Sequence, residues 1–271
     1  MNKILRKICF FSMLIFLLCI CICSKVFFSG EILAQNCTSP EASDQERVPH
    51  IVLVELFIQA NCPTCPTAEF CLEDLAWEYG TSKFILVQEH LWDDGYDTPE
   101  TNARYDWYVG EGKRGTPDVF IDGLTKRIQG LFCECAEENY QCYKEAIDQE
   151  LNQESFIKIS ATKIFEKSTL IIEGSVKNLS DVHLEDLAVC GMVGKEKNEP
   201  GLYNYIQDIF PFQEIPTLSP GAVFSFRFIS EGSLLFTSNV EEEEGKPEIL
   251  HLIVFVQDLK TKEVLQSLYI E

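Results

Sequence analysis

The sequence predicts an α/β domain at residues 48–153, with a mixed sheet and helices on both faces, followed by an all-β sandwich domain at residues 154–271. Two observations carry this prediction. Strand-like and helix-like segments alternate as far as residue 152, which favours a mixed sheet flanked by helices. From Phe156 onward the helical pattern disappears and apolar residues recur at every second position, as in strands that bury one face.

The first domain is predicted to run in the order β-α-β-α-β-β-α. Strands are expected at residues 51–57, 83–89, 118–121 and 126–129, and helices at 67–79, 100–108 and 140–152. Asp122-Gly123 supplies the turn between the last two strands. Because this hairpin reverses direction once relative to an antiparallel neighbour, strand 126–129 should run parallel to strand 51–57. Its end should then emerge at the edge that carries Cys62.

The second domain is predicted from its two-residue period alone. Three runs show the period clearly: Ile157-Ile159-Ala161, Phe224-Phe226-Phe228 and Leu252-Val254-Val256. About 115 residues with six or seven short strands suit a β-sandwich.

Residues 1–34 have the layout of a secretory signal. Lys3, Arg6 and Lys7 precede an apolar stretch at residues 8–23, which is shorter than the roughly 20 residues of a membrane span. Ala34 is a small residue suited to cleavage, and an uncleaved N-terminal anchor is the alternative. We therefore expect an extracytoplasmic protein, either periplasmic, secreted or attached to a membrane or cell surface, with residues 35–47 as a polar linker.

The charge of the exported chain excludes one class of partner. Export would remove four of the 22 basic residues and one of the 43 acidic ones, which leaves a formal charge of −24. Such a charge repels phosphate backbones, so nucleic acid is not an expected partner.

Cysteine is abundant, with 12 residues in the chain, four of them within the export segment. An even number of eight remaining cysteines in an exported protein favours disulfides over zinc thiolates. Outside the pair at positions 62 and 65, the pairing stays open for Cys37, Cys71, Cys133, Cys135, Cys142 and Cys190. For Cys133 and Cys135 we consider structural bridges to Cys142 and Cys71, a second redox pair, and a zinc site.

Two motifs carry a family resemblance. The stretch VELFIQANCPTCP, then GTPDVFIDG some fifty residues later, then an amphipathic helix, resemble the thioredoxin superfamily over residues 48–153. Cys62-Pro63-Thr64-Cys65 stands at its active-site position and Thr116-Pro117 at its cis-proline position. The whole chain also looks like exported bacterial proteins that join such a domain to a β-sandwich. The resemblance implies a thiol–disulfide oxidoreductase that acts on protein thiols and disulfides without a cofactor.

The chemistry of the first motif also follows from its placement. A strand that leads into a helix start puts Cys62 where unpaired backbone N–H groups and the helix dipole stabilise a thiolate. Such sites lower the pKa of a thiol from about 8.5 into the range of ~3.5–7.5. Cys62 would then attack a disulfide, and the sheltered Cys65 would resolve the mixed intermediate. A Cys62–Cys65 bridge that never turns over is the structural alternative.

Three further positions are candidates for the site. Glu55 is the only charge in strand 51–57 and resembles the acid that assists proton transfer at the resolving cysteine, although it stands one residue further from the first cysteine. A strand-end surface glutamate is the alternative. A cis bond at Thr116-Pro117 would leave the Thr116 backbone free to pair with a substrate strand, whereas an ordinary turn proline would not.

The segment at residues 89–108 departs from plain thioredoxin and is rich in aromatic and charged residues. Trp92 is a candidate substrate-binding residue, and His90, Asp93 and Arg104 are candidates for the same groove. Simple packing of the tryptophan and an Asp93–Arg104 ion pair form the structural alternative.

Two other classes of function stay open. A non-catalytic exported binding module would use all its cysteines for structural disulfides. A copper- or zinc-binding metallochaperone would need His90 to join Cys62 and Cys65 as ligands. Our leading prediction contains neither a metal nor a cofactor.

Overall fold

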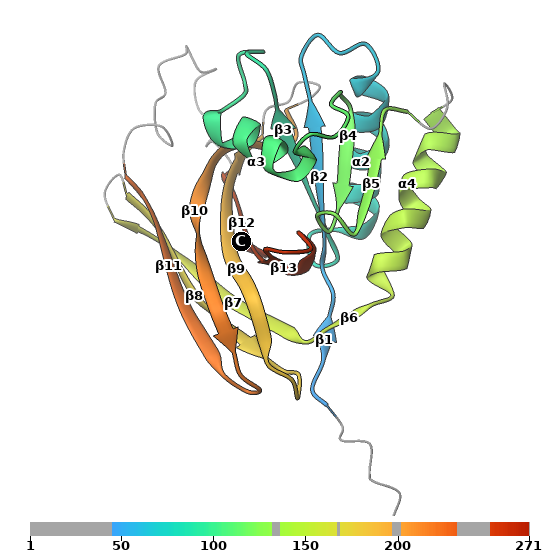
Figure 1. The fold of residues 1–271 in the computed structure, drawn as a ribbon. Coiled ribbons are helices and arrows are strands. Elements are labelled where there is room, and N and C mark those ends of the chain that lie inside the picture. The colour runs from blue at the N-terminus through green and yellow to red at the C-terminus, as the bar shows by residue number, and fades with distance from the viewer. Residues whose placement is uncertain (1–44, 132–135, 167–168, 197–201, 232–249, 271) are drawn as a thin grey trace, which may run out of the picture. The chain divides into compact units, whose positions relative to one another are not determined.

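The computed structural model describes residues 45–131, 136–166, 169–196, 202–231 and 250–270. Within these ranges the chain has a mixed α/β fold that is mostly sheet (Figure 1). No helix within them is long and apolar enough to cross a membrane. The predicted signal or anchor at residues 1–34 lies outside the described residues, as do Cys37, Cys133 and Cys135.

The first part of the described chain alternates strands and helices in the predicted order. It contains β1 (Val48–Pro49), β2 (Val52–Ile58), α2 (Cys65–Tyr79), β3 (Phe84–His90), α3 (Pro99–Val109), β4 (Asp118–Ile121), β5 (Lys126–Gln129), α4 (Ala136–Leu151) and β6 (Glu154–Ser155). The bounds of β4 and β5 are those predicted, while α2 begins two residues and α4 four residues earlier than expected.

The rest of the described chain is strand, as the two-residue period predicts. It contains β7 (Ile157–Glu166), β8 (Thr169–Asn178), β9 (Leu184–Lys195), β10 (Tyr205–Leu218), β11 (Val223–Glu231), β12 (Leu250–Asp258) and β13 (Val264–Ile270). A buried apolar cluster joins residues of β7, β8 and β11 to residues of β9, β10 and β12. Strands β11, β8 and β7 thus form a three-stranded sheet that packs on the neighbouring strands.

The central sheet crosses the predicted domain boundary. Its eight strands have the order β13-β12-β9-β10-β3-β2-β4-β5. Strand β2 is parallel to β3 and antiparallel to β4, and β5 is antiparallel to β4, so β5 runs in the direction of β2 as predicted. Strands β3 and β10 join through a single parallel pairing, Tyr205 with Gln88. The described residues, from 45 to 270, belong to one compact unit.

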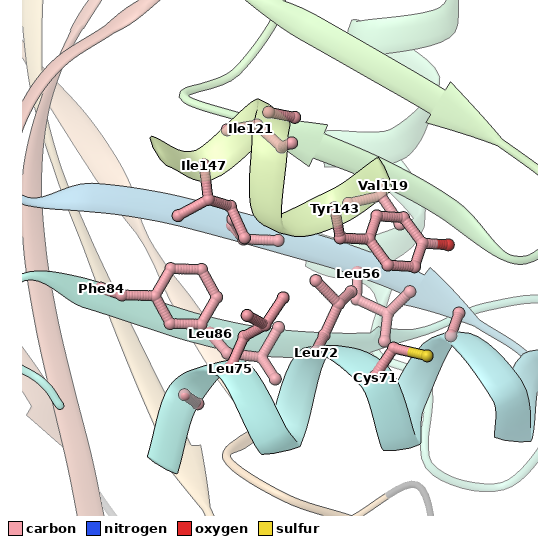
Figure 2. Close-up of a cluster of buried hydrophobic side chains, with 14 of the residues drawn as sticks. Leu56, Cys71, Leu72, Leu75, Phe84, Leu86, Val119, Ile121, Tyr143 and Ile147 are labelled. Atoms are coloured by element: carbon pink, nitrogen blue, oxygen red, sulfur yellow. The ribbon is translucent and has the colours of Figure 1, made fainter. Parts of the chain in front are cut away.

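Strand β2 is buried on both faces. Alternate residues such as Val54 and Leu56 pack against helices α2 and α4, in the cluster shown in Figure 2. Leu53 points to the opposite face and packs against apolar residues of β9 and β12, while Phe57 packs against α3. Helices therefore cover both faces of this sheet as predicted, and strands of the C-terminal part share one of them.

A tight turn joins the two parts of the unit at another point. Asp122 and Gly123, between β4 and β5, both have positive φ angles of 46° and 65°. A Cβ atom on Gly123 would lie 2.0 Å from the backbone oxygen of Lys262 in the β12–β13 turn. Glycine is therefore required here both by the backbone conformation and by the close approach of the second turn.

Candidate active site

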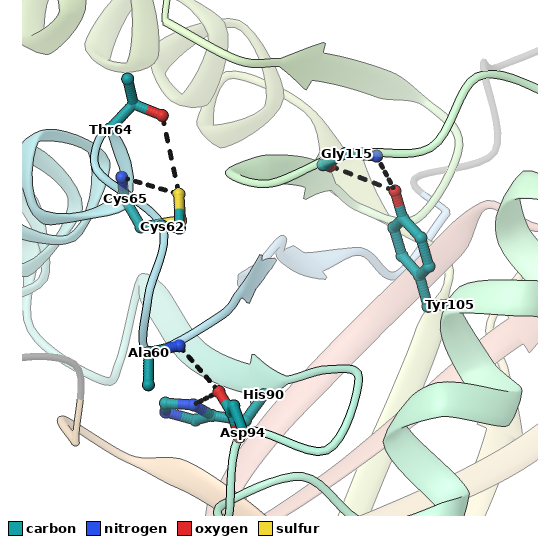
Figure 3. The surroundings of a disulfide bond; sticks show 8 residues. All are labelled: Ala60, Cys62, Thr64, Cys65, His90, Asp94, Tyr105 and Gly115. Atoms are coloured by element: carbon teal, nitrogen blue, oxygen red, sulfur yellow. Dashed lines mark hydrogen bonds and ion pairs between the residues drawn. A yellow bond between two sulfur atoms is a disulfide. The ribbon is translucent and has the colours of Figure 1, made fainter.

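The cysteine motif lies between the end of β2 and the start of α2. Helix α2 begins at Cys65, and its N-cap residue Thr64 makes no side-chain capping hydrogen bond. The backbone N–H of Cys65 donates instead to Cys62 Sγ at 3.1 Å, and Thr64 Oγ1 lies 3.6 Å from the same sulfur (Figure 3). Cys62 Sγ thus takes the place of a capping acceptor at the helix start, which is a position that stabilises negative charge.

The two sulfur atoms form a disulfide and differ in their exposure. Cys65 is 1% exposed and belongs to the apolar cluster beneath α2, whereas Cys62 is half-buried. Pro63 and Thr64, between them, are exposed. A partner molecule can therefore reach Cys62 but not Cys65, as the sequence predicts for an attacking and a resolving thiol.

A second loop supports the segment that leads to Cys62. Asp94, after β3, accepts a hydrogen bond from the backbone N–H of Ala60 at 2.9 Å, and its same oxygen lies 2.6 Å from His90 Nδ1 (Figure 3). Both side chains are buried. His90 is therefore engaged with a carboxylate beneath the motif, and the described residues contain no group of three or more metal-binding side chains.

The Thr116–Pro117 peptide bond is cis. Asp118, the next residue, pairs with Phe57 of β2, so Thr116 and Pro117 lie beside the segment that leads from β2 to the motif. On its other side the Pro117 carbonyl accepts a hydrogen bond from the N–H of Gly130 at 2.7 Å. The proposed pairing of Thr116 with a substrate strand stays a prediction.

Trp92 lies at the same end of the sheet, two residues after β3. It is 37% exposed, its φ angle is 63°, and its N–H donates to Asn102 Oδ1 at 3.1 Å. Its ring packs edge-on against Tyr105 of α3, with 5.7 Å between the ring centroids. The side chain is thus partly free to contact a partner, and its role in substrate binding stays a prediction.

The structure does not place Glu55 with the cysteines. Its neighbours Val54 and Leu56 share an apolar cluster with Cys65, so Glu55 points to the opposite face of the sheet. There it is fully buried and forms a bidentate ion pair with Arg104, whose Nη2 donates to Oε2 at 2.9 Å. The alternative of a surface glutamate is wrong, because Glu55 is buried. The predicted proton relay from Glu55 to Cys65 is also corrected, because a shift of one residue along a strand moves a side chain to the other face of the sheet.

The alternative of an Asp93–Arg104 ion pair is also wrong, because Arg104 forms its ion pair with the buried Glu55. A second buried carboxyl, Glu89, lies 3.9 Å from Arg104 Nε. Burial, and then the neighbouring Glu55 carboxylate, raise the pKa of Glu89 well above its ordinary value of 4.5. Arg104 therefore pairs with Glu55, and the second carboxyl, Glu89, has a raised pKa beside this pair.

The other described cysteines lie outside the cysteine motif and are buried or half-buried. Cys190 is a buried free thiol, whose pKa burial raises to about 12, and Cys142 is a half-buried free thiol. Cys71 is buried, with its sulfur 3.4 Å from the backbone oxygen of Ala136. Because the Cys142 thiol is free, the structural bridge considered from Cys133 or Cys135 to Cys142 is not formed. Cys133 and Cys135 themselves lie outside the described residues.

Sequence reasoning missed two residues that hold the loop before Pro117. Tyr105 of α3 and Asp118 at the start of β4 are both fully buried, and their side chains share a hydrogen bond of 2.8 Å. A charge directly before the apolar run at residues 119–121 could have indicated Asp118. The position of Tyr105 depends on how α3 packs, which no local pattern reports.

Comparisons with known proteins show a shared fold. No protein-family model matches the chain, and no curated protein matches it. HBP35 of Porphyromonas gingivalis aligns with a TM-score of 0.59 and 12% identity, over 82% of this chain and 75% of that one. A domain of the outer membrane lipoprotein Omp28 from Porphyromonas gingivalis gives a TM-score of 0.31 at 15% identity, over 43% and 88% of the two chains. Bacteroides uniformis beta-glucuronidase gives 0.29 at 19% identity, over 42% and 12%. Of these three, the likeness to HBP35 is the one that reaches the level of a common fold.

Proposed function

We propose that this protein is an extracytoplasmic thiol–disulfide oxidoreductase that uses the Cys62–Cys65 pair on protein substrates. The observation that carries the proposal is the asymmetry of the pair: a reachable Cys62 whose sulfur accepts the first N–H of α2, beside a Cys65 that is 1% exposed. A purely structural bridge gains nothing from one exposed sulfur at a helix start. A nucleophile requires both features.

The reaction is a pair of thiol–disulfide exchanges. In the reducing direction the Cys62 thiolate attacks a client disulfide, so that a Cys62–client bond forms and one client sulfur leaves as a thiolate. The Cys65 thiolate then attacks Cys62 Sγ, which releases the second client thiolate and forms the Cys62–Cys65 disulfide. Two electrons pass to the client, solvent protonates the client thiolates, and a small dithiol or a partner protein dithiol restores the reduced pair. Oxidation of a client follows the same steps in reverse.

The architecture supports the same proposal. We infer that residues 48–153 form a thioredoxin-like unit, on the basis of the order β2-α2-β3-α3-β4-β5-α4 and the motif at the start of α2. We infer that strands β7–β13 form a β-sandwich, since two layers of strand enclose one apolar cluster. We propose that this part docks a client or the cell surface. The signal-like segment at residues 1–34 supports an extracytoplasmic location.

The test compares cysteine variants of the purified protein with dithiothreitol as reductant and insulin as disulfide substrate. Wild type should turn over, Cys62→Ser should not, and Cys142→Ser should match wild type because its half-buried thiol is free and outside the site. Equal rates in wild type and Cys62→Ser would assign the pair to a structural disulfide. Stoichiometric copper or zinc in protein purified without oxygen would favour the metallochaperone alternative.

A further inference from the structure

Tyr105 of α3 contacts two segments at the end of the sheet that carries the cysteine motif: the loop that precedes β4, and Trp92 after β3. The Tyr105 hydroxyl accepts a hydrogen bond from the backbone N–H of Gly115 at 3.1 Å (Figure 3). It also donates to Asp118 Oδ2 at 2.8 Å. These two residues bracket Thr116 and Pro117. The hydroxyl group therefore bridges both ends of the short loop that precedes β4.

The ring of the same tyrosine supports Trp92 and is itself fixed by the core. It is fully buried, with ring centroids 5.0 Å from Phe57 and 5.7 Å from Trp92. Burial raises the pKa of Tyr105 to about 12, so the hydroxyl keeps its proton at all pH values at which thiol exchange is assayed. The tyrosine thus stays a rigid, uncharged support between the loop and the tryptophan.

Asp118 completes the arrangement from the other side. Its carboxylate is fully buried and accepts hydrogen bonds from Arg127 Nε at 2.9 Å and from Arg127 Nη2 at 2.6 Å. Arg127 Nη2 also donates to the backbone oxygen of Lys113 at 2.6 Å, so the same arginine holds the chain on the far side of Gly115. Buried charge-assisted bonds of this kind leave the acceptor little freedom to move.

We propose that Tyr105 is a positioning residue that holds the Gly115–Pro117 loop and Trp92 beside Cys62 so that the site selects an extended polypeptide around the client disulfide. The inference rests on the proposed function and adds to it the residue that positions the loop and the tryptophan for a polypeptide substrate. A polypeptide strand needs backbone partners at a fixed distance from the attacked sulfur, and the loop offers them only while both of its ends are held. A small disulfide needs only an open path to Cys62.

Loss of the hydroxyl should therefore act on one class of substrate. In Tyr105→Phe the ring still fills the core, but Gly115 loses its acceptor and Asp118 loses a donor. Loose positioning of a binding element raises KM when the element contacts the substrate before and during the reaction. We expect KM for an unstructured peptide disulfide to rise about tenfold, with kcat within about twofold. The rate with 2-hydroxyethyl disulfide should stay within about twofold of wild type.

The matched control is Tyr108→Phe, which removes a buried hydroxyl one turn further along α3. That hydroxyl donates to Glu55 and accepts from Arg104 and Gln257, none of which belongs to the loop. Both variants should lose similar thermal stability, but the control should retain wild-type KM for the peptide. Trp92→Leu, at a partly exposed position, gives a second variant that should show the same selective rise in KM.

The outcomes separate this inference from the proposed function. A wild-type protein that turns over neither substrate overturns both. If the wild type is active, two results for Tyr105→Phe overturn the positioning role alone. In the first, KM is unchanged for both the peptide disulfide and 2-hydroxyethyl disulfide. In the second, turnover of both substrates slows by the same factor. An equal rise in peptide KM for Tyr108→Phe also overturns it, because the effect would then belong to general loosening of α3. Alkylation of reduced Cys62 at an unchanged rate in Tyr105→Phe is part of the expected result.

Discussion

Glu69 provides a quantitative test of how α2 packs on the sheet. It lies one turn after Cys65 and is only 7% exposed. Burial, and then the nearby Glu73, raise the pKa of Glu69 from 4.5 to about 7, although His90 opposes the rise. Because the folded protein holds this proton more tightly than the unfolded chain does, the contribution of Glu69 to stability is complete below pH 4.5. It is lost as the pH rises through about 7.

The size of the effect follows from the rise in pKa. At about 1.4 kcal/mol for each pKa unit the upper bound is about 3 kcal/mol, and residual contact with solvent reduces the expected value to roughly 1–2 kcal/mol. Glu69→Gln removes the titration and keeps the shape of the side chain. The variant should therefore be more stable than wild type by that amount at pH 8, and the difference should vanish toward pH 4.

Urea unfolding of the oxidised protein at pH 4, 6 and 8 measures this difference. Glu78→Gln on the same helix is the control, since hydrogen bonds from Lys144 and Tyr140 lower the pKa of Glu78. Glu78 contributes stability above its ordinary pKa, and that contribution is lost as the pH falls through its lowered value. Its variant should consequently be less stable than wild type at pH 8. A Glu69→Gln variant that follows the pH dependence of wild type would refute the assigned packing of α2.

Three further predictions concern the site and the fold. Alkylation of the reduced protein at pH 6 should label Cys62 at least ~10 times faster than Cys65, and the reverse order would exchange their roles. Glu55→Gln should lower the free energy of unfolding by about 3 kcal/mol, because Arg104 loses its buried partner, while insulin turnover stays at the wild-type level. A lost turnover in a folded variant would restore the proton relay. Gly123→Ala should cost about 2 kcal/mol or more, measured by thermal unfolding, since the new Cβ meets a backbone oxygen at 2.0 Å.

Local sequence patterns predicted most helices and strands, because the residues within and beside each of these elements favour its conformation. The hairpin at β4 and β5 has the predicted bounds, since Asp122 and Gly123 can both adopt the positive φ that the turn requires. The start of α2 was placed two residues late, because its N-cap residue forms no side-chain cap and a sulfur serves instead. Thr64 is a residue type that commonly caps helices, but its side chain forms no capping hydrogen bond here, so the helix start does not follow from the usual cap.

The site was only partly predictable, because some of its residues lie in short sequence motifs and others are brought together by tertiary packing. The cysteine pair and Thr116-Pro117 are short motifs, and their environments follow from the strands β2 and β4 that they adjoin. Glu55 was misassigned because a single offset in register reverses the face of a strand, and sequence distance from Cys62 does not report the face. The residues that hold the loop before β4 come from a helix and two strands, so their proximity depends on tertiary packing.

Strands from both sides of residue 153 share one sheet and its buried core. Strand β12 has apolar residues on both faces, with Val254 in the cluster toward β7 and β8 and Phe255 in the cluster toward β2 and β3. Such continuous runs are typical of strands buried on both sides, whereas a sandwich edge or an outer sheet has one polar face. Gln257 at the end of β12 extends this contact to α3, because its amide donates to the Tyr108 hydroxyl at 2.8 Å. The C-terminal strands therefore complete the core on which α3 rests, and α3 in turn supports the loop beside the cysteines.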